Sequence, residues 1–185
     1  MIIAIKRDGK VVVGISICDC SIDMTESDLA LADNLPFWKV KGEKDCYVCT
    51  EDLTYSTDLL RYNDYVFKGI SDGRSVIEKV LPRMKELLGK HNRLVNDKEW
   101  NNQMLIIKGD RIFRITNYLC VSEIDEYTVM GYESYIQGTL DETRDIAPEE
   151  SILSAVRNVN RMRNRQFFPI TVFDSKSKRK KVYYK

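Results

Sequence analysis

MIIAIKRDGKVVVGI, residues 1–15, decides the fold of this chain. Two runs of apolar and β-branched residues, 2–6 and 10–17, flank the dipeptide Asp8-Gly9. Asp-Gly favours a type I′ turn, whose twist matches that of two paired antiparallel strands. The stretch therefore predicts a β-hairpin. Because both runs are apolar almost without a break, we expect both faces of the hairpin to be covered.

The middle of the chain predicts short strands followed by helices. Residues 21–36 are acidic and polar without a clean period, which indicates a loop. From Val76 to Leu88 the apolar residues recur with the spacing of one helix face. Pro82 falls inside this stripe, and we expect it to kink the helix. The predicted strands cover 37–40 and 46–49, and the predicted helices cover 51–66 and 71–89.

The second half returns to strands, then helices, then strands. Gly109-Asp110 indicates a second hairpin, and Pro148 with the acids around it indicates a helix start. The predicted strands cover 104–108, 111–115, 118–122, 127–130, 169–174 and 181–184, and the predicted helices cover 131–143 and 145–162. A doubly wound parallel sheet would instead alternate single strands with helices. The order favours an α+β fold, a four-layer αββα sandwich of two antiparallel sheets flanked by helices.

The composition limits the classes of protein and of site that this chain can form. The 185 residues, 43% apolar and 31% charged, are typical of a globular protein, and we expect one domain over residues 1–185. The single histidine, His91, excludes a site built from several histidines. No apolar run is long enough for a membrane helix, and charges at Lys6 and Arg7 interrupt what could be a signal peptide. We therefore expect a cytoplasmic protein without membrane contact.

The net charge of +1 conceals an uneven distribution. Residues 157–185 hold ten bases and one acid, while the other 156 residues hold 19 bases and 27 acids. We call the following residues the basic strip: Arg157, Arg161, Arg165, Lys178, Arg179, Lys180 and Lys181. Three interpretations stay open: a solvated surface that discourages strand aggregation, a nucleic-acid site that Tyr183 and Tyr184 could support by stacking, or a docking surface for the acidic face of a neighbouring subunit.

The five cysteines allow a weak metal hypothesis. Cys18, Cys20, Cys46 and Cys49 could form a four-thiolate zinc site, but the first pair is one residue short of the usual spacing. Cysteines also pack as small buried apolar residues. An odd number of cysteines without a secretion signal favours free thiols. We expect no metal and no cofactor.

Several of these stretches together resemble a known family. They are Met1–Gly14, Phe37–Val40 followed by Asp45–Val48, Met104–Asp110, Val129-Met130-Gly131 leading into a helix, and Pro148–Met162. In this order they resemble the N-terminal nucleophile (Ntn) hydrolases, and more narrowly proteasome subunits and the bacterial HslV-type peptidase. The resemblance implies self-association, with a ring as one form of it.

The resemblance also implies a place for the active site. In that family an N-terminal Thr attacks the peptide carbonyl, and its own α-amine or a nearby Lys takes the proton. With Gly9 matched to the family's hairpin glycine, the nucleophile falls one residue before Met1. Ser16 stands where the family has an acid, Tyr132 stands where it has a small Ser, and Lys39 matches the site lysine. A methionine at position 1 gives no sign of a removed propeptide.

We therefore expect an Ntn-type fold without Thr peptidase activity, which acts as an assembly or interaction subunit. Met1, Ser16, Lys39 and Tyr132 are the candidates for a vestigial site. One alternative is an active peptidase or amide hydrolase that uses a different nucleophile, such as Cys46 or Cys49. The other is a nucleic-acid-binding module that uses the basic strip.

Overall fold

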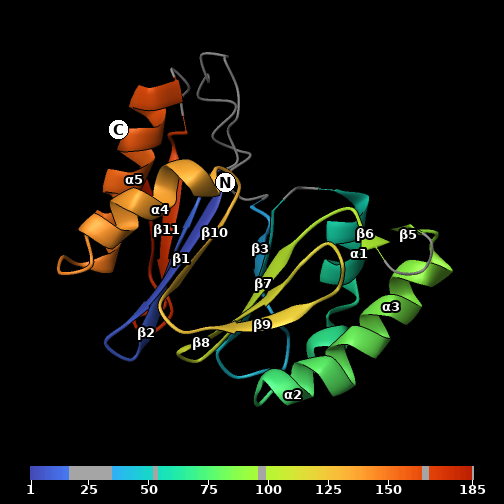
Figure 1. The fold of residues 1–185 in the computed structure, drawn as a ribbon. Helices are drawn as coiled ribbons and strands as arrows, with labels where there is room; N and C mark the ends of the chain where they lie inside the picture. The colour runs from blue at the N-terminus through green and yellow to red at the C-terminus, as the bar shows by residue number, and fades with distance from the viewer. Residues whose placement is uncertain (17–34, 52–53, 96–98, 164–166, 185) are drawn as a thin grey trace. The chain divides into compact units, whose positions relative to one another are not determined.

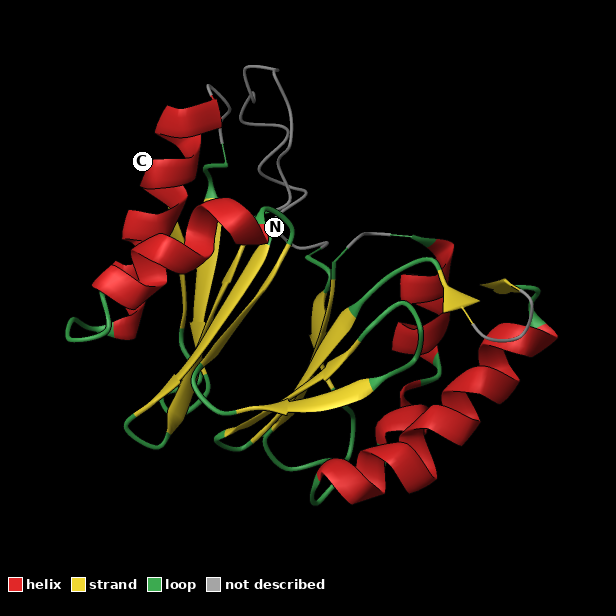
Figure 2. Cartoon of the chain, viewed as in Figure 1, coloured by secondary structure: helices red, strands yellow, loops and turns green. Residues whose placement is uncertain are grey.

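The chain divides into two compact units. The computed structural model describes residues 1–16, 35–51, 54–95, 99–163 and 167–184. The first unit is made of Met1–Leu35 and Glu126–Lys185, and the second of Pro36–Asp125. Each unit contains a five-stranded antiparallel sheet. Helices pack on the sheet in each unit (Figure 2). The α+β fold with two antiparallel sheets is as predicted.

The sheet of the first unit joins both ends of the chain. Its order is β10-β1-β2-β11-β12, so β10 and β12 form its two edges (Figure 1). The strands are β1 (Ile2–Arg7), β2 (Lys10–Ile15), β10 (Tyr127–Met130), β11 (Ile170–Asp174) and β12 (Lys180–Tyr183). The two helices are α4 (Glu133–Glu142) and α5 (Pro148–Arg163). The predicted β1–β2 hairpin is confirmed. The last two predicted strands are present as β11 and β12, which pair antiparallel as a second hairpin.

The β1–β2 turn has the geometry that its dipeptide favours. Asp8 and Gly9 both have positive φ, 54° and 66°, as a type I′ turn requires. Arg7 pairs with Lys10 on either side of the turn. Because a type I′ turn matches the strand twist, this dipeptide sets the register of the whole hairpin.

Helix α5 supplies the apolar layer over the first sheet. The helical spacing predicts a buried stripe of Ile152, Leu153, Val156, Val159 and Met162, and the first four are buried. Met162, near the end of the helix, is exposed instead. The four buried side chains pack with residues from β1, β2 and β11 in one apolar core. Gly14 on β2 allows the close approach, since a Cβ at this position would lie 2.4 Å from Ile152 Cγ2.

The second unit has its own sheet and its own core. The sheet order is β3-β4-β7-β8-β9, and the separate pair β5–β6 was not predicted. The strands are β3 (Phe37–Lys39), β4 (Cys46–Thr50), β5 (Leu94–Val95), β6 (Glu99–Trp100), β7 (Met104–Lys108), β8 (Arg111–Ile115) and β9 (Val121–Ile124). The helical segments are α1 (Tyr55–Tyr62), a 3₁₀ turn (Asp64–Phe67), α2 (Gly73–Ser75), a π turn (Val76–Val80) and α3 (Leu81–Lys90).

Helix α1 and strand β9 both begin later than predicted. Helix α1 begins at Tyr55 rather than near residue 51, because the Thr54 side chain accepts a hydrogen bond from the Thr57 backbone and caps it. Thr50, directly before the predicted start of this helix, is the last residue of strand β4. Strand β9 begins at Val121 rather than at 118, and Leu119 just before it has φ of 59°, a left-handed conformation that no strand continues. The loop predicted over 21–36 lies mostly outside the described residues.

Pro82 falls directly after a local change in helix type. The Leu81 N–H donates to the Val76 carbonyl, an i→i−5 hydrogen bond that belongs to the π turn. Pro82 follows within one continuous run of helical residues, 73–90, directly after this π turn. The predicted irregularity is therefore present as a π turn, one of the recognised causes of helix bending.

Replacing Glu43 with glutamine is expected to lower the free energy of unfolding at pH 7 by about 1–2 kcal/mol. The Glu43 carboxylate accepts a hydrogen bond from Lys108 Nζ at 2.6 Å and another from the Gly69 backbone at 2.9 Å. These two bonds lower the pKa of Glu43 below its ordinary value of 4.5. A lowered folded-state pKa adds stability above the unfolded-state value, and that stability is lost as pH falls through the folded value.

Urea denaturation of both proteins from pH 7 downward measures this effect. The difference between wild type and Glu43→Gln should shrink below about pH 4.5 and then vanish. Glu86→Gln, at an exposed position on α3, is the matched control and should change little at any pH. A difference that stays constant with pH would rule out the carboxylate as its source.

Candidate functional site

Three of the four predicted site residues lie at one end of the first unit's sheet. The Met1 amine donates to the Ser16 carbonyl at 3.0 Å, and the Ser16 N–H donates to the Met1 carbonyl at 2.9 Å. These bonds extend the β1–β2 pairing by one residue. Ile2 pairs with Met130 on the other side, so Gly131 and Tyr132 follow from the strand next to Met1.

The Ser16 hydroxyl is engaged in a short hydrogen bond. Its Oγ donates to the Phe167 carbonyl at 2.6 Å, and the residue is only 2% exposed. The Phe167 N–H in turn donates to the Asn160 side chain on α5 at 2.9 Å. The position that the resemblance assigns to an acid therefore holds a neutral alcohol that fixes the chain after α5.

Tyr132 forms the strand-to-helix turn in place of a small residue. Its backbone is left-handed, with φ of 62°, and it precedes the first residue of α4. Its ring meets the ring of Phe167 edge to face, with centroids 4.9 Å apart. The same Phe167 thus contacts Ser16 through its carbonyl and Tyr132 through its ring. The resulting contact set, Met1, Ser16, Tyr132 and Phe167, is called the terminal cluster below.

The chemistry available to the terminal cluster is limited. A nucleophilic hydroxyl needs a neighbouring base that takes its proton. The proton of Ser16 instead points to an amide carbonyl, which is a very weak base. Phe167 could not be identified from the sequence as a member of this cluster, because a backbone carbonyl leaves no signal in residue type.

Lys39 lies in the other unit. It is the last residue of β3, is exposed, and pairs with Tyr47 on β4. The terminal cluster lies entirely in the first unit. The structure therefore brings together Met1, Ser16 and Tyr132, and Lys39 is placed on a separate sheet.

Strand β4 holds two buried thiols. Cys46 and Cys49 are both fully inaccessible to solvent. Burial raises the pKa of Cys46 to about 12 and raises the pKa of Cys49 well above its ordinary value. Cys18 and Cys20, the other half of the zinc hypothesis, lie outside the described residues. Among the described residues there is no group of three or more side chains that could hold a metal ion.

Alkylation with iodoacetamide at pH 8 is expected to leave Cys46 and Cys49 unmodified in the folded protein. Only a thiolate reacts, and burial both removes the thiolate and blocks access. Cys120 is exposed and should react quickly. Peptide mass mapping checks this, with a sample unfolded in urea as the control in which all three react. Rapid modification of Cys46 or Cys49 without urea would contradict the described burial.

The basic strip forms two separate patches. Arg157 and Arg161 are exposed on α5, and Arg165 lies outside the described residues. Residues 178–181 are exposed at the β11–β12 hairpin, where Lys181 Nζ lies 3.2 Å from Glu149 Oε1. Glu149 is the second residue of α5, so Arg161 lies twelve residues or about 18 Å further along the helix. One stretch of sequence therefore supplies two patches.

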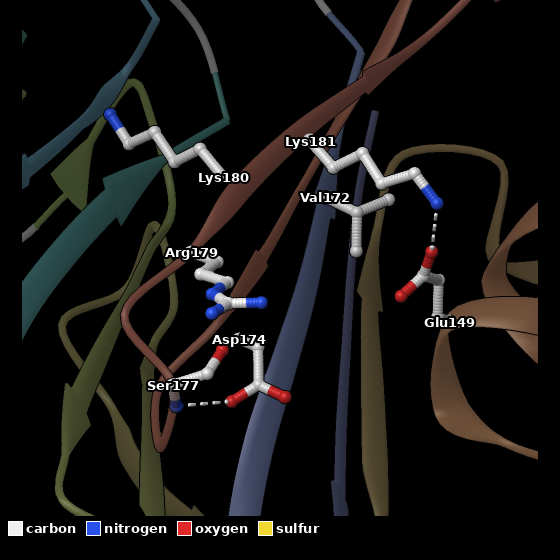
Figure 3. Close-up of a pocket in the computed structure, with 7 residues that line it drawn as sticks. All are labelled: Glu149, Val172, Asp174, Ser177, Arg179, Lys180 and Lys181. Atoms are coloured by element: carbon white, nitrogen blue, oxygen red, sulfur yellow. Dashed lines mark hydrogen bonds and ion pairs between the residues drawn. The ribbon is translucent and has the colours of Figure 1, made fainter.

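A hollow of about 370 Å³ adjoins the hairpin patch. Its lining is drawn in Figure 3 and consists of Glu149, Val172, Asp174, Ser177, Arg179, Lys180 and Lys181. Both of its acids have partners, since Glu149 pairs with Lys181 and Asp174 pairs with Lys10. Burial alone would raise the pKa of the Asp174 carboxyl, but hydrogen bonds from the Ser177 backbone, from Lys10 and from the Lys176 backbone together lower this pKa below its ordinary value. Tyr183, expected as a stacking residue, is partly buried, while Tyr184 is exposed.

Within the described part of the chain, no helix has the length and apolar character that a membrane crossing requires.

Comparison with known proteins identifies the fold. No protein-family model matches the sequence, and no curated protein matches it. The structure is similar to BPH from Thiobacillus denitrificans, with a TM-score of 0.69 and 18% identity over 94% of this chain and 96% of that one. It is also similar to Anbu, described as an ancestral beta-subunit, from Yersinia bercovieri, with a TM-score of 0.67 and 12% identity over 100% and 87% of the two chains.

A third similar structure is HslV from Trypanosoma brucei, with a TM-score of 0.60 and 10% identity over 94% of this chain and 97% of that one. All three likenesses span nearly the whole chain. Together they show an Ntn-hydrolase, HslV-like fold, as the residues of the β1–β2 hairpin and the later elements predict.

Proposed function

We propose that this chain is a proteasome-subunit-like protein that lacks Thr-type peptidase activity and acts as an assembly or interaction subunit. The observation that carries the proposal is the hydrogen bond from Ser16 Oγ to the Phe167 carbonyl. It places an engaged alcohol, rather than an ionised acid, beside the first residue of the hairpin. The fold supports the subunit role, since one similar structure is described as a beta-subunit.

The bulk of Tyr132 supports the same proposal. A small residue at the strand-to-helix turn would leave room beside residue 1 for a substrate carbonyl. The Tyr132 ring packs on Phe167 instead, at a centroid distance of 4.9 Å. Two of the positions that the family uses for chemistry are thus occupied by side chains that pack and hydrogen-bond within the first unit.

A different nucleophile is the main rival. Cys46 and Cys49 are the candidate thiols, and burial raises the pKa of both. A thiol without an exposed thiolate attacks slowly, so the geometry favours a packing role. We further propose that the two units make up one domain, since the similar structures span 94–100% of the chain, and that the protein is cytoplasmic and self-associates.

Turnover of fluorogenic peptides tests the proposed loss of activity. The wild-type protein, at micromolar concentration, should release no fluorophore above the buffer rate. Ser16→Ala and the pair Cys46→Ala/Cys49→Ala serve as matched variants. Turnover by the wild type that one of these variants abolishes would show an active hydrolase and identify its nucleophile.

A further inference from the structure

The first unit carries opposite charges at the two edges of one sheet. Residues 126–142, which run from edge strand β10 through α4, hold four acids and no base. Residues 176–181, which lead into the other edge strand β12, hold five bases and no acid. Both edges belong to the same sheet, in the order β10-β1-β2-β11-β12. The uneven charge distribution of the sequence therefore places negative charge near the β10 edge of this sheet and positive charge near its β12 edge.

The β12 edge offers a place for an incoming carboxylate. The hollow beside it is lined by Arg179, whose side chain makes no hydrogen bond or ion pair with any described residue. The two acids of the hollow are already paired, with Lys10 and with Lys181. An Arg guanidinium binds a carboxylate through two parallel hydrogen bonds, which gives direction as well as attraction. Figure 3 shows Arg179 next to Asp174 on the hairpin.

The β10 edge offers carboxylates of the matching sign. Glu126, Asp141 and Glu142 are exposed there, and Tyr127 of β10 donates to Asp141 at 2.9 Å. Arg144 contacts both Glu126 and Asp141, at 3.2 and 3.0 Å, so one base serves two acids. Glu142 forms no ion pair or hydrogen bond with any described side chain. The edge keeps a net negative charge.

We propose that the β12 edge and its hollow bind the acidic β10 edge of a second copy of this chain. The proposal rests on the self-association proposed above and assigns the surface for it. A symmetric contact would place five bases against five bases, or acids against acids, and like charges facing each other are costly. The head-to-tail contact pairs opposite charges instead. In an open row of copies joined this way, each of the two terminal copies keeps one unpaired edge. The row closes into a ring when the rotation between neighbouring copies allows it.

Charge reversal at each edge, with sedimentation velocity as the readout, tests this surface. The basic-edge variant is Arg179→Glu/Lys180→Glu, and the acidic-edge variant is Glu126→Lys/Glu142→Lys. The wild type should sediment as a multiple of 21.5 kDa, and each variant alone as a monomer, with the contact weakened by about 100-fold or more. Circular dichroism should show that both variants fold, because all four positions are exposed.

Mixing the two variants is the decisive step. Each retains one intact edge, and the two reversed edges carry opposite charges, so an equal mixture should again sediment above the monomer. The matched control, Lys85→Glu/Lys90→Glu, makes the same charge change on exposed positions of α3 and should assemble like the wild type.

Three results would overturn the proposal. Unchanged assembly of both edge variants would exclude this surface while leaving self-association in place. A wild type that is monomeric throughout would overturn the self-association itself along with the surface. Loss of heparin retention in the basic-edge variant, with its assembly unchanged, would assign the hairpin patch to a polyanion instead.

Discussion

Replacing Gly14 with valine is expected to lower the free energy of unfolding by about 3 kcal/mol. A Cβ at this position would lie 2.4 Å from Ile152 Cγ2 and 3.1 Å from Ile170 Cδ1. Ile152 is fully buried in the core beneath α5, so it cannot move into solvent to make room. The added side chain must push the helix away from the sheet or force strained rotamers, and both are costly.

Urea denaturation in two backgrounds measures this clash. In an Ile152→Ala background, which removes the obstructing methyl groups, the additional cost of Gly14→Val should fall by more than about 1 kcal/mol. Gly138→Val is the control, because a Cβ at Gly138 on α4 would meet nothing within 4 Å. Equal costs of Gly14→Val in both backgrounds would contradict the close packing of β2 against α5.

Replacing Trp100 with alanine is expected to lower the free energy of unfolding by about 3–5 kcal/mol. Trp100 is 1% exposed and belongs to the core of the second unit, so its removal leaves a large cavity. Its indole Nε1 is also buried, and no described residue accepts a hydrogen bond from it. Packing of the side chain therefore stabilises the unit. The buried N–H without an acceptor offsets part of this stabilisation.

Trp100→Phe separates these two contributions. Phenylalanine keeps much of the ring contact and removes the unsatisfied N–H, so it should cost less than half as much as Trp100→Ala. Chemical denaturation of the three proteins under the same conditions gives the comparison. A phenylalanine variant as unstable as the alanine variant would contradict the stabilising role assigned to ring packing at this position.

The sequence predicts the local part of this fold well. Asp8-Gly9 and Gly109-Asp110 each encode a turn in two residues, and both hairpins form at the predicted positions. The stripe on α5 is equally local, since its spacing alone identifies the buried face. Pairings such as β1 with β10, or β2 with β11, join segments more than a hundred residues apart. No local pattern specifies such a pairing, and the sequence did not predict it.

The terminal cluster was predictable only in part. The family resemblance named Met1, Ser16, Lys39 and Tyr132 as site candidates, and the first unit holds Met1, Ser16 and Tyr132. It did not identify Phe167, which links Ser16 to Tyr132 through one carbonyl and one ring. Caps were a second source of error: Thr50 and Thr54 both suit a helix start, and the choice between them depends on where strand β4 ends.

Covalent labelling tests most directly whether this Ntn-type fold lacks its nucleophile. The native protein is incubated with a peptide epoxyketone, an electrophile that requires a hydroxyl or thiol activated by a neighbouring amine, and its intact mass is recorded beside that of Ser16→Ala. We predict no adduct on residues 1–16 in either protein, because the Ser16 hydroxyl is hydrogen-bonded to the Phe167 carbonyl. A stoichiometric adduct on the wild-type hairpin that Ser16→Ala abolishes would contradict that prediction.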